Sequence, residues 1–344
     1  MLTNHVLDRI LTTIPKQTIG VLGDLFLDRY LDLDAALTEP SIETGLDAYQ
    51  VVSVRSYPGA AGTVINNLAA FGARAIVPIS MIGDDGEGYE LRQALQQMPS
   101  VRLANLVASS DRRTPTYTKP MLCQQGETRR ELNRLDIKNR KALPGEVEAK
   151  ILDLLSATWD SFDGLLVLDQ VSEPECGVVT ARVRARLAEL GAKDPGKIVI
   201  ADSRARIGLF RNVWLKPNER ECLRAVGEEE LDVSGAILTL AKRTQRPVFC
   251  TRSEQGMLVA EPGGTTPIQV AGYPVAGPID PVGAGDSSSA ALLCALAAGV
   301  SLGEAAAFGN LVASITIQQI GTTGTASPQQ IRDRWRTIQS ASSS

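Results

Sequence analysis

The chain has 344 residues, of which 44% are hydrophobic and 22% charged, a balance typical of a globular protein with a full hydrophobic core. Its net charge of -4, without any basic block interleaved with aromatic residues, argues against nucleic acid as a partner and favours small molecules. The single histidine, His5, nearly excludes imidazole-based triads and clustered histidine metal sites, so an acid or base must be a carboxylate, Lys, Tyr or Cys.

Cysteine usage and the apolar runs predict a location. The cysteines are odd in number, far apart and never spaced as Cys-x-x-Cys, which fits neither a disulfide framework nor a zinc site. The first residues lack an apolar signal core, and the apolar run that begins at Ala290 is too short to span a bilayer. We therefore expect a cytoplasmic protein without export or membrane anchoring.

The first buried strand is expected at residues 18–23, TIGVLG, with Asp24 at its carboxyl end and Asp28 four residues on. Open α/β sheets bind ligands at that edge, although a turn or capping role for Asp24 remains equally open. Residues 31–57 are first rich in acidic residues and then alternate between apolar and polar ones. This pattern indicates an exposed excursion from the sheet. We interpret this excursion as a cover over a site, with an ordinary edge hairpin as the alternative.

Small residues open the next helix, in the stretch PGAAGTVINNLAAFGA at residues 58–73. Asn66 and Asn67 are poor interior helix residues without partners, and they favour a polar ligand nearby. Residues 112–137 contain two alternating segments around a turn at residues 124–127, a hairpin pattern. A small sheet made of this hairpin and the excursion at residues 31–57 could close over a ligand and exclude water.

Helix and strand alternate regularly from about residue 145, with helices expected at residues 145–156 and 174–190, and this alternation predicts a parallel sheet. Asn218 and Glu221 stand three apart at a later helix start, where they could hold a hydrated Mg²⁺ or form a simple capping box. Without an internal repeat or linker, residues 1–340 are predicted to form one domain, followed by a disordered tail at residues 341–344.

The stretch DPVGAGDSSSAALL, residues 280–293, combines a small-residue turn, a carboxylate and an apolar helical run. Gly283, Ala284 and Gly285 would let the backbone approach an anion at the unpaired N–H groups of the helix start. Asp286 lies at that start, where it could be a base or only a helix cap. The stretch alone does not decide between these two interpretations.

Taken together, these pieces resemble the ribokinase-like (PfkB) family of sugar kinases over nearly the whole chain. DPVGAGDSS resembles the C-terminal signature of that family, PGAAGTVINNLAAFGA with IGDDGEG its N-terminal signature, and PNERE its Asn-x-x-Glu motif. Within the family, GDLFLDRY, TRSEQGM and GTTGTASP are most similar to the heptose-phosphate kinase domain of ADP-heptose synthesis. The resemblance implies an α/β fold, a three-layer α/β/α sandwich with a mainly parallel central sheet and a small β-sheet lid.

The resemblance also implies an ATP-dependent phosphotransferase that acts on a hydroxyl of a sugar or sugar phosphate, with a heptose 7-phosphate-like substrate favoured. Asp286 would be the general base, and the backbone around Gly283, Ala284 and Gly285 would stabilise the transferring phosphoryl group. Asn218 and Glu221 would organise Mg²⁺ through its waters. A monovalent cation is a further cofactor to consider. The other nucleotide-side positions are Thr251, Ser253, Gly256 and, near the adenine, Asn310.

On the sugar side the resemblance places Lys119 on the lid hairpin, where it would contact a phosphate that the substrate already carries. A homodimer through the exposed edge of the lid is a further expectation. The residue types leave open which sugar, which hydroxyl and which oligomer are involved. The remaining positions implied for the substrate are Asp24, Asp28, Gly59, Thr63 and Asn67.

Several positions depart from the family pattern, Pro281 and Ser288 among them. Ala60 stands where a second glycine is usual, Thr63 where an asparagine contacts sugar hydroxyls, and Val282 where a threonine is usual. These changes leave Asp286, Gly283 and Gly285 in place. They therefore put the identity of the sugar in question more than the type of reaction. They also motivate an alternative, a non-catalytic sugar or nucleotide sensor on the same fold. A dinucleotide oxidoreductase is disfavoured because Ser288 stands where the Gly-x-Gly-x-x-Gly fingerprint needs glycine.

Overall fold

A nine-stranded sheet lies at the centre of the computed structural model, which describes residues 2–123, 130–227 and 232–342. The strand order is β14-β13-β12-β11-β10-β9-β1-β4-β5; neighbours run parallel from β12 to β5, and β13 and β14 pair antiparallel at the other edge. The strands are β1 Thr18–Gly23, β4 Ala75–Gly83, β5 Leu106–Ser109, β9 Gly164–Asp169, β10 Ile198–Ser203, β11 Trp214–Leu215, β12 Val248–Thr251, β13 Met257–Ala260 and β14 Ile268–Val270.

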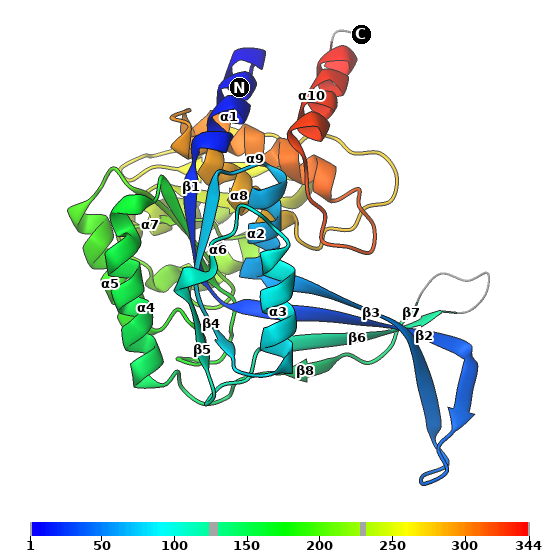
Figure 1. The fold of residues 1–344 in the computed structure, drawn as a ribbon. Coiled ribbons are helices and arrows are strands. Elements are labelled where there is room, and N and C mark those ends of the chain that lie inside the picture. The colour runs from blue at the N-terminus through cyan, green and yellow to red at the C-terminus, as the bar shows by residue number, and fades with distance from the viewer. Residues whose placement is uncertain (1, 124–129, 228–231, 343–344) are drawn as a thin grey trace.

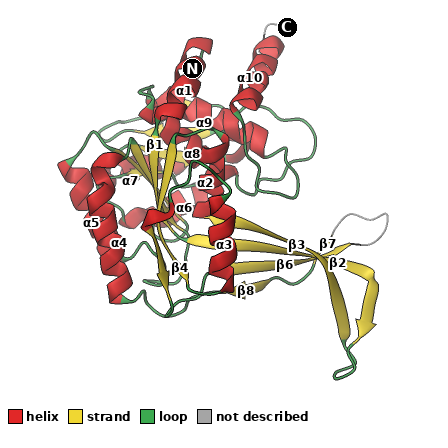
Figure 2. Cartoon of the chain, viewed as in Figure 1, coloured by secondary structure: helices red, strands yellow, loops and turns green. Residues whose placement is uncertain are grey.

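Helices cover both faces of this sheet, so that the protein has three layers (Figures 1 and 2). Successive side chains of a strand point to opposite faces, and in β9 Leu166 and Leu168 enter one hydrophobic core while Leu165 and Val167 enter the other. One core takes in α1 Asn4–Thr13, α2 Ala61–Ala70, α3 Gly86–Gln96, α8 Ala284–Ala297, α9 Leu302–Thr316 and α10 Pro328–Ser342; the other takes in α4 Gly145–Thr158, α5 Ala181–Lys193, α6 Glu219–Val226 and α7 Val233–Thr244.

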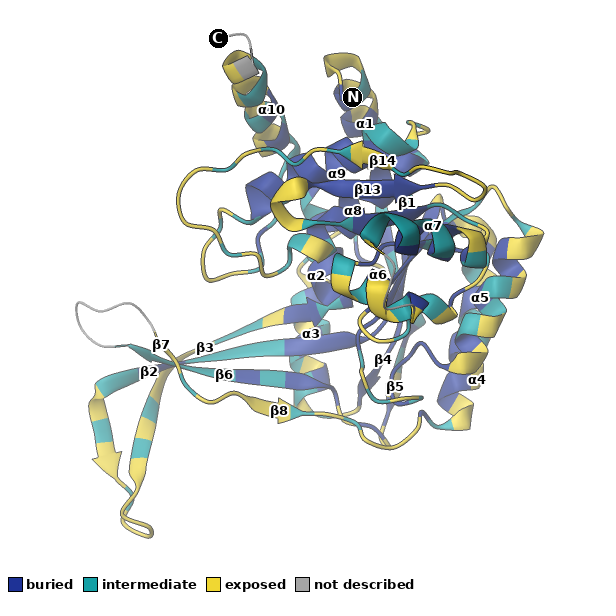
Figure 3. Ribbon diagram, turned by 180° about the vertical axis from the view of Figure 1, so that it is seen from behind, coloured by how far each residue is buried: buried dark blue, intermediate teal, exposed yellow. Residues whose placement is uncertain are grey.

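A second sheet projects from this body, as Figure 1 shows. Its order is β3-β2-β6-β7, with β8 paired to β6, so the two predicted segments, residues 31–57 and 112–137, do meet in one small sheet. The outer part of β2 and β3 carries many exposed residues, whereas the inner part is buried against the body (Figure 3). The strands are β2 Leu25–Pro40, β3 Asp47–Ala60, β6 Thr116–Cys123, β7 Arg130–Glu131 and β8 Leu135–Ile137.

Two predicted boundaries differ from the structure. The helix expected at residues 174–190 begins only at Ala181, because Thr180 caps it and the preceding loop bends so that the Val178 N–H reaches Asp24. The expected tail at residues 341–344 starts too early, since α10 continues through Ser342 without any helix-breaking residue. Residues 343–344 and the predicted turn at residues 124–127 lie outside the described residues.

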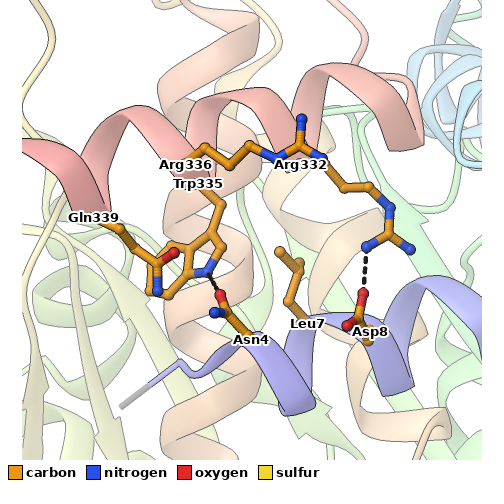
Figure 4. Close-up of a pocket in the computed structure, with 7 residues that line it drawn as sticks. All are labelled: Asn4, Leu7, Asp8, Arg332, Trp335, Arg336 and Gln339. Atoms are coloured by element: carbon orange, nitrogen blue, oxygen red, sulfur yellow. Dashed lines mark hydrogen bonds and ion pairs between the residues drawn. The ribbon is translucent and has the colours of Figure 1, made fainter.

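The two terminal helices lie side by side at the end of the molecule opposite the small sheet (Figure 1). The Trp335 Nε1–H donates to Asn4 Oδ1 at 2.6 Å, and Arg332 pairs with Asp8 across the groove between α1 and α10 (Figure 4). This groove has a volume of about 240 Å³. None of the predicted site residues lines the groove, and the two contacts across it join the terminal helices. Along the described ranges, no helix combines the length and apolar character needed to cross a bilayer.

Candidate active site

Helix α8 begins with a glycine in the left-handed backbone region. Gly283, with φ +82°, is its N-cap, and no side chain caps the helix. The Ala284 N–H donates to Pro281 O at 3.1 Å, so this amide is already engaged. In the first turn of a helix the N–H groups lack a carbonyl partner within the helix, which leaves the Gly285 and Asp286 amides free to bind an anion. The Ala284 N–H is engaged by the protein, and its implied contact with the phosphoryl group stays a prediction.

Asp286 lies in this first turn and carries a perturbed carboxyl group. Burial raises its pKa from 3.8 to about 7, and the like charge of Asp202 adds to the effect, whereas Lys216 and Arg204 oppose it. The side chain is only partly accessible to solvent. A carboxylate with this pKa is suited to exchange a proton near neutral pH, which a plain helix cap has no need to do.

Lys216 brings a buried positive charge to the same place. Its Nζ lies 2.9 Å from Asp202 Oδ2 at the end of β10, and a Cβ added at Gly285 would come within 3.7 Å of that nitrogen. Burial acts to lower the lysine pKa, but Asp202, Glu221 and Asp286 together raise it, so the ammonium stays charged. A fixed cation therefore stands beside the free amides of α8.

Asn218 and Glu221 form the capping box that their spacing allows. The Asn218 side chain accepts from the Glu221 N–H, and the Glu221 side chain accepts from the Asn218 N–H, both at 2.9 Å. Burial raises the Glu221 pKa, with Asp202 adding to the rise and Lys216 opposing it. The capping geometry holds the Glu221 carboxylate near Asp202 and Lys216. A capping box and a role in organising Mg²⁺ are therefore compatible for Asn218 and Glu221.

The residues predicted along the nucleotide lie on neighbouring elements. Thr251, at the end of β12, lies beside Asn218 in a backbone bridge. Ser253 and Gly256 bound the next turn with φ values of +49° and +84°, and a Cβ at Gly256 would collide with the Val270 carbonyl at 2.2 Å. Asn310 on α9 donates to the Val270 and Ala271 carbonyls at 3.1 and 3.0 Å.

The structure gives Asn310 a clear structural task, which is to fix the chain after β14 against which Gly256 packs. Its contact with the adenine stays a prediction. The same holds for Thr251 and Ser253, whose positions agree with a shared site but whose ligand contacts nothing in the structure tests.

Asp28, Gly59 and Lys119 meet where the small sheet joins the body. A Cβ at Gly59 would lie 2.5 Å from Asp28 Oδ2, so glycine is needed for the carboxylate to stay in place. Lys119 Nζ lies 3.6 Å from Asp28 Oδ1 and donates to the Tyr30 hydroxyl at 3.0 Å. Burial raises the Asp28 pKa, and Lys119 opposes the rise. These three predicted residues thus form one polar cluster.

Asp24, in contrast, is buried and engaged by backbone groups. Its Oδ2 accepts from the Gln170 and Val171 N–H groups at 2.8 and 3.0 Å, and its Oδ1 accepts from the Val178 N–H at 2.7 Å. Burial raises its pKa to about 6, an effect larger than that of its amide donors. Asp24 therefore ties the loop after β9 to the end of β1, which is a structural role beside the one implied for it.

Thr63 and Asn67 are also enclosed, within α2. Asn67 has no accessible surface, and its Nδ2 donates to the Thr63 carbonyl at 3.0 Å. Within the described residues, Asn67 Oδ1 has no hydrogen-bond partner. The structure thus brings Asp28, Gly59 and Lys119 together but leaves Thr63 and Asn67 inside the helix layer, and their sugar contacts stay predictions.

Ala60, one of the departures from the family pattern, keeps a glycine-like backbone. It is the N-cap of α2, with φ +53° and ψ -117°, a combination that L-amino acids rarely adopt. The next N–H, of Ala61, donates to the Asp24 carbonyl at 3.0 Å and fixes this turn against the end of β1. The fold therefore needs the glycine conformation even though the sequence supplies alanine.

A pocket of about 160 Å³ opens between the small sheet and the loops that follow β9 and β10. Phe26 and Tyr117 line its sheet side, and Arg134, Lys138 and Arg204 bring positive charge to it. The positive charge of Arg204 also opposes the rise in the pKa of both Asp28 and Asp286.

Sequence reasoning missed Lys216, Arg204 and Arg134 as site residues. Lys216 directly precedes the PNERE motif, and Arg204 follows a strand end already noted for its aspartate, Asp202. Both could have been found by examining the residues immediately next to each motif. Arg134 has no such signal, because only the pairing of β6 with β8 brings its segment to the pocket.

Comparison with known proteins shows the family to which the chain belongs. Residues 31–330 match the family described as "pfkB family carbohydrate kinase". The chain belongs to this family. It is accordingly an enzyme of the phosphotransferase class with a hydroxyl group as acceptor.

Two curated relatives of this pfkB family chain are bifunctional proteins HldE. The protein of Citrifermentans bemidjiense is 32% identical over 319 residues, which cover 90% of this chain and 62% of the relative. That of Geotalea uraniireducens is 32% identical over 317 residues, covering 90% and 61%. The chain thus spans somewhat less than two thirds of the length of these relatives.

Solved structures share the fold at low sequence identity. Phosphofructokinase-2 of Escherichia coli, in complex with potassium, has a TM-score of 0.69 at 19% identity, with 94% of this chain and 99% of that one covered. Ribokinase of Arabidopsis thaliana, complexed with ribose and ATP, has a TM-score of 0.64 at 18% identity, with 92% and 98% covered. The predicted ribokinase-like three-layer sandwich with a small second sheet is confirmed.

Proposed function

We propose that this pfkB family member is an ATP-dependent kinase that transfers the γ-phosphoryl group of ATP to a hydroxyl of a sugar or sugar phosphate. The observation that carries the proposal is Asp286, with its pKa raised to about 7, in the first turn of α8 beside the Lys216 ammonium. A base is most effective when its pKa lies near the working pH.

Each group then has one task. The Asp286 carboxylate accepts the proton of the acceptor hydroxyl, while the acceptor oxygen forms its bond to the γ-phosphorus and the bond from that phosphorus to ADP breaks. The Gly285 amide and the Lys216 ammonium stabilise the negative charge on the transferring group. Glycine at position 285 leaves the space beside Lys216 open, where a Cβ would make an ordinary van der Waals contact with the ammonium at 3.7 Å.

Mg²⁺ is part of the proposal, and the residues present fit it. Magnesium keeps several waters and is held by one or two carboxylates together with the substrate phosphates. Glu221, fixed by Asn218, and the neighbouring Asp202 provide such carboxylates, while the part of the chain described here holds no cluster of three or more His, Cys, Asp or Glu placed to bind a metal. When bound, the ion neutralises phosphate charge. The potassium complex of the E. coli relative supports testing a monovalent cation as well.

ATP would lie along Thr251, Ser253 and Gly256, with Asn310 near the adenine. This placement is supported by Gly256 and Asn310, which both lie against the backbone of Val270 and Ala271 at the end of β14. On the acceptor side, Asp28 with Gly59 would hold sugar hydroxyls, and Asp24, Thr63 and Asn67 would shape that part of the site. A heptose 7-phosphate-like acceptor is favoured by the resemblance in GDLFLDRY, TRSEQGM and GTTGTASP.

The remaining features belong to the same proposal. Residues 1–340 would act as one kinase domain, and the small sheet would be its lid. The outer strand β3 exposes Val51, Val52 and Val54 by about half of their surface, which supports a homodimer through this edge. All cysteines that the structure describes are free thiols, in keeping with a cytoplasmic location.

A coupled assay of ADP release tests the proposed function. The full chain is incubated with Mg-ATP and, in turn, heptose 7-phosphate, fructose phosphates, ribose and nucleosides. We expect acceptor-dependent ADP release with a sugar phosphate and loss of it in Asp286→Asn. Absence of release with every acceptor, in protein that binds ATP, would instead favour the non-catalytic sensor.

A further inference from the structure

Two segments of the proposed nucleotide side come from different elements and meet at the backbone. Asn218, the N-cap of α6, forms a backbone bridge with Thr251, and the Thr251 N–H donates to Pro217 O at 3.0 Å. The turn after β12, residues 252–256, is closed by a hydrogen bond of 2.8 Å from its first N–H to its last carbonyl. The backbone therefore joins the capping box of α6 to this turn along one short line of contact.

An ion pair adds a second contact between the same two segments. The Arg252 Nε–H donates to Glu219 Oε1, and Glu219 is the first residue of α6, directly after the Asn218 cap. The side chains are 22% and 41% exposed, so the pair lies at the edge of the protein. Ion pairs this exposed add little to overall stability. The pair therefore bears on the local geometry of α6 and the turn more than on the stability of the fold.

The same arginine also reaches the chain on the other side of the turn. Its Nη1–H donates to Gln269 Oε1 at 3.4 Å, and the Gln269 Nε2–H donates to Gln255 O at 2.8 Å. A Cβ at Gly272, two residues after β14, would lie 2.6 Å from the Glu254 carbonyl oxygen, so the chain there packs directly on the turn. Arg252 thus connects the start of α6, the turn after β12 and strand β14.

Resting on the proposed kinase function, we infer that Arg252 and Glu219 are positioning residues, which hold the capping box of α6 and the turn after β12 at one fixed separation. In that function the turn lies along ATP, and Glu221 organises the Mg²⁺ that accompanies its phosphates. A ligand with two linked parts binds best when the two surfaces that contact it are already held at the right separation. The ion pair therefore makes the affinity for ATP depend on Mg²⁺ and, by linkage, the affinity for Mg²⁺ depend on ATP.

The test measures ATP binding to the full chain by calorimetry, with and without Mg²⁺, so that it needs no acceptor. In the wild type Mg²⁺ should tighten ATP binding by about 5–150-fold, the usual size of a coupling between two sites. Arg252→Gln and Glu219→Gln should each reduce this factor at least threefold, while the affinity for ATP without Mg²⁺ changes less than threefold. Arg186→Gln on α5, whose side chain pairs with Glu189 at 3.0 Å, is the matched control and should behave as the wild type.

The two single variants separate position from charge. Arg252→Gln removes a cation and Glu219→Gln removes an anion, so a purely electrostatic effect on the anionic nucleotide would move its affinity in opposite directions. A smaller Mg²⁺ effect in both variants, with the double variant no worse than either single one, supports the positioning pair. Opposite shifts, additive losses or an unchanged Mg²⁺ effect overturn it. A lower Tm with the Mg²⁺ effect intact would likewise show that the pair is only a structural contact.

Failure of the proposed function would give a different result. If the Mg²⁺ effect on ATP binding falls in both variants as expected, but no acceptor releases ADP with the wild type, the kinase is refuted and the positioning pair stands. If an acceptor reacts in the wild type and Mg²⁺ leaves the affinity for ATP unchanged, the kinase stands and the positioning pair is refuted.

Discussion

Helices α8 and α2 begin in similar ways with different residues. Each starts at a residue with positive φ, +82° at Gly283 and +53° at Ala60, and neither start has a side-chain cap. At α8 the sequence supplies the glycine that this backbone needs. At α2 it supplies alanine, so the turn is strained. The comparison shows that the fold, and not the local residue, sets the backbone at Ala60.

The surroundings of the two starts differ as well. At α2 the Ala61 N–H donates to the Asp24 carbonyl, so the turn is tied to strand β1. At α8 the Gly285 amide stands free beside Lys216 and a carboxylate with a raised pKa. The same positive-φ start thus ties α2 to strand β1, whereas in α8 it leaves a free amide that would bind an anion in the proposed function. Four changes would break or sharpen this contrast.

Replacing the base should have the largest effect. Asp286→Asn is expected to lower kcat by about 10²–10⁴-fold, the range for loss of a general base, with ATP binding retained. Steady-state kinetics and nucleotide titration measure both quantities. Turnover close to the wild-type value would reduce Asp286 to a helix residue without catalytic function, as in α2.

Stability of the same variant provides its folding control. The folded pKa of Asp286, about 7, lies above its ordinary value of 3.8, so the stability linked to protonation is fully present below pH 3.8 and is lost as pH rises through 7. Asparagine does not ionise, so the Asp286→Asn variant does not lose this stability as pH rises. Its Tm at pH 8 should therefore equal or exceed that of the wild type in thermal melts.

The pH dependence comes second. Because the base must be ionised, kcat/KM should fall about tenfold for each pH unit below 7, roughly 100-fold by pH 5. Asp202→Asn removes the like charge beside Asp286, so the fall in kcat/KM should occur at a lower pH. A limb near pH 4 in the wild type would contradict the raised pKa. Profiles from pH 4 to 9 at saturating Mg-ATP distinguish these outcomes, since a fall near pH 4 would leave kcat/KM nearly unchanged between pH 5 and 7.

Gly283→Ala should have an intermediate effect. A side chain at φ +82° costs about 1–2 kcal/mol, and relaxing the strain would turn the Gly285 amide away from its position. We expect that loss of unfolding free energy together with a roughly tenfold lower kcat. Gly72→Ala, at φ +83° with open space around it, is the control and should lose similar stability with unchanged kcat.

The smallest change is expected for Ala60→Gly. Relief of strain, partly offset by the greater freedom of glycine in the unfolded chain, should stabilise the protein by about 1 kcal/mol. Chemical denaturation measures the gain. The control Ala61→Gly, in the first turn of α2, should instead destabilise by about 0.5–1 kcal/mol. A less stable Ala60→Gly would show that the alanine is not strained.

The sequence by itself determined the layers, the small sheet and the stretch that contains Asp286. Buried parallel strands and helix starts leave local signals, because apolar runs, caps and glycines act over a few residues. The same local logic placed Asn218 and Glu221 correctly in a capping box. The resemblance to the family, and not the local pattern, pointed to Asp28, Gly59 and Lys119, which the structure brings into one cluster.

The tertiary structure alone decided which charges meet. Asp202 at the end of β10, Lys216 just after β11 and Asp286 in α8 meet only in the fold, and the raised pKa of Asp286 comes from its burial and from the like charge of Asp202. It likewise showed that Asp24 is occupied by backbone amides and that Ala60 adopts a glycine conformation. Electrostatic and desolvation energies depend on distances through space, and no pattern along the chain contains those distances.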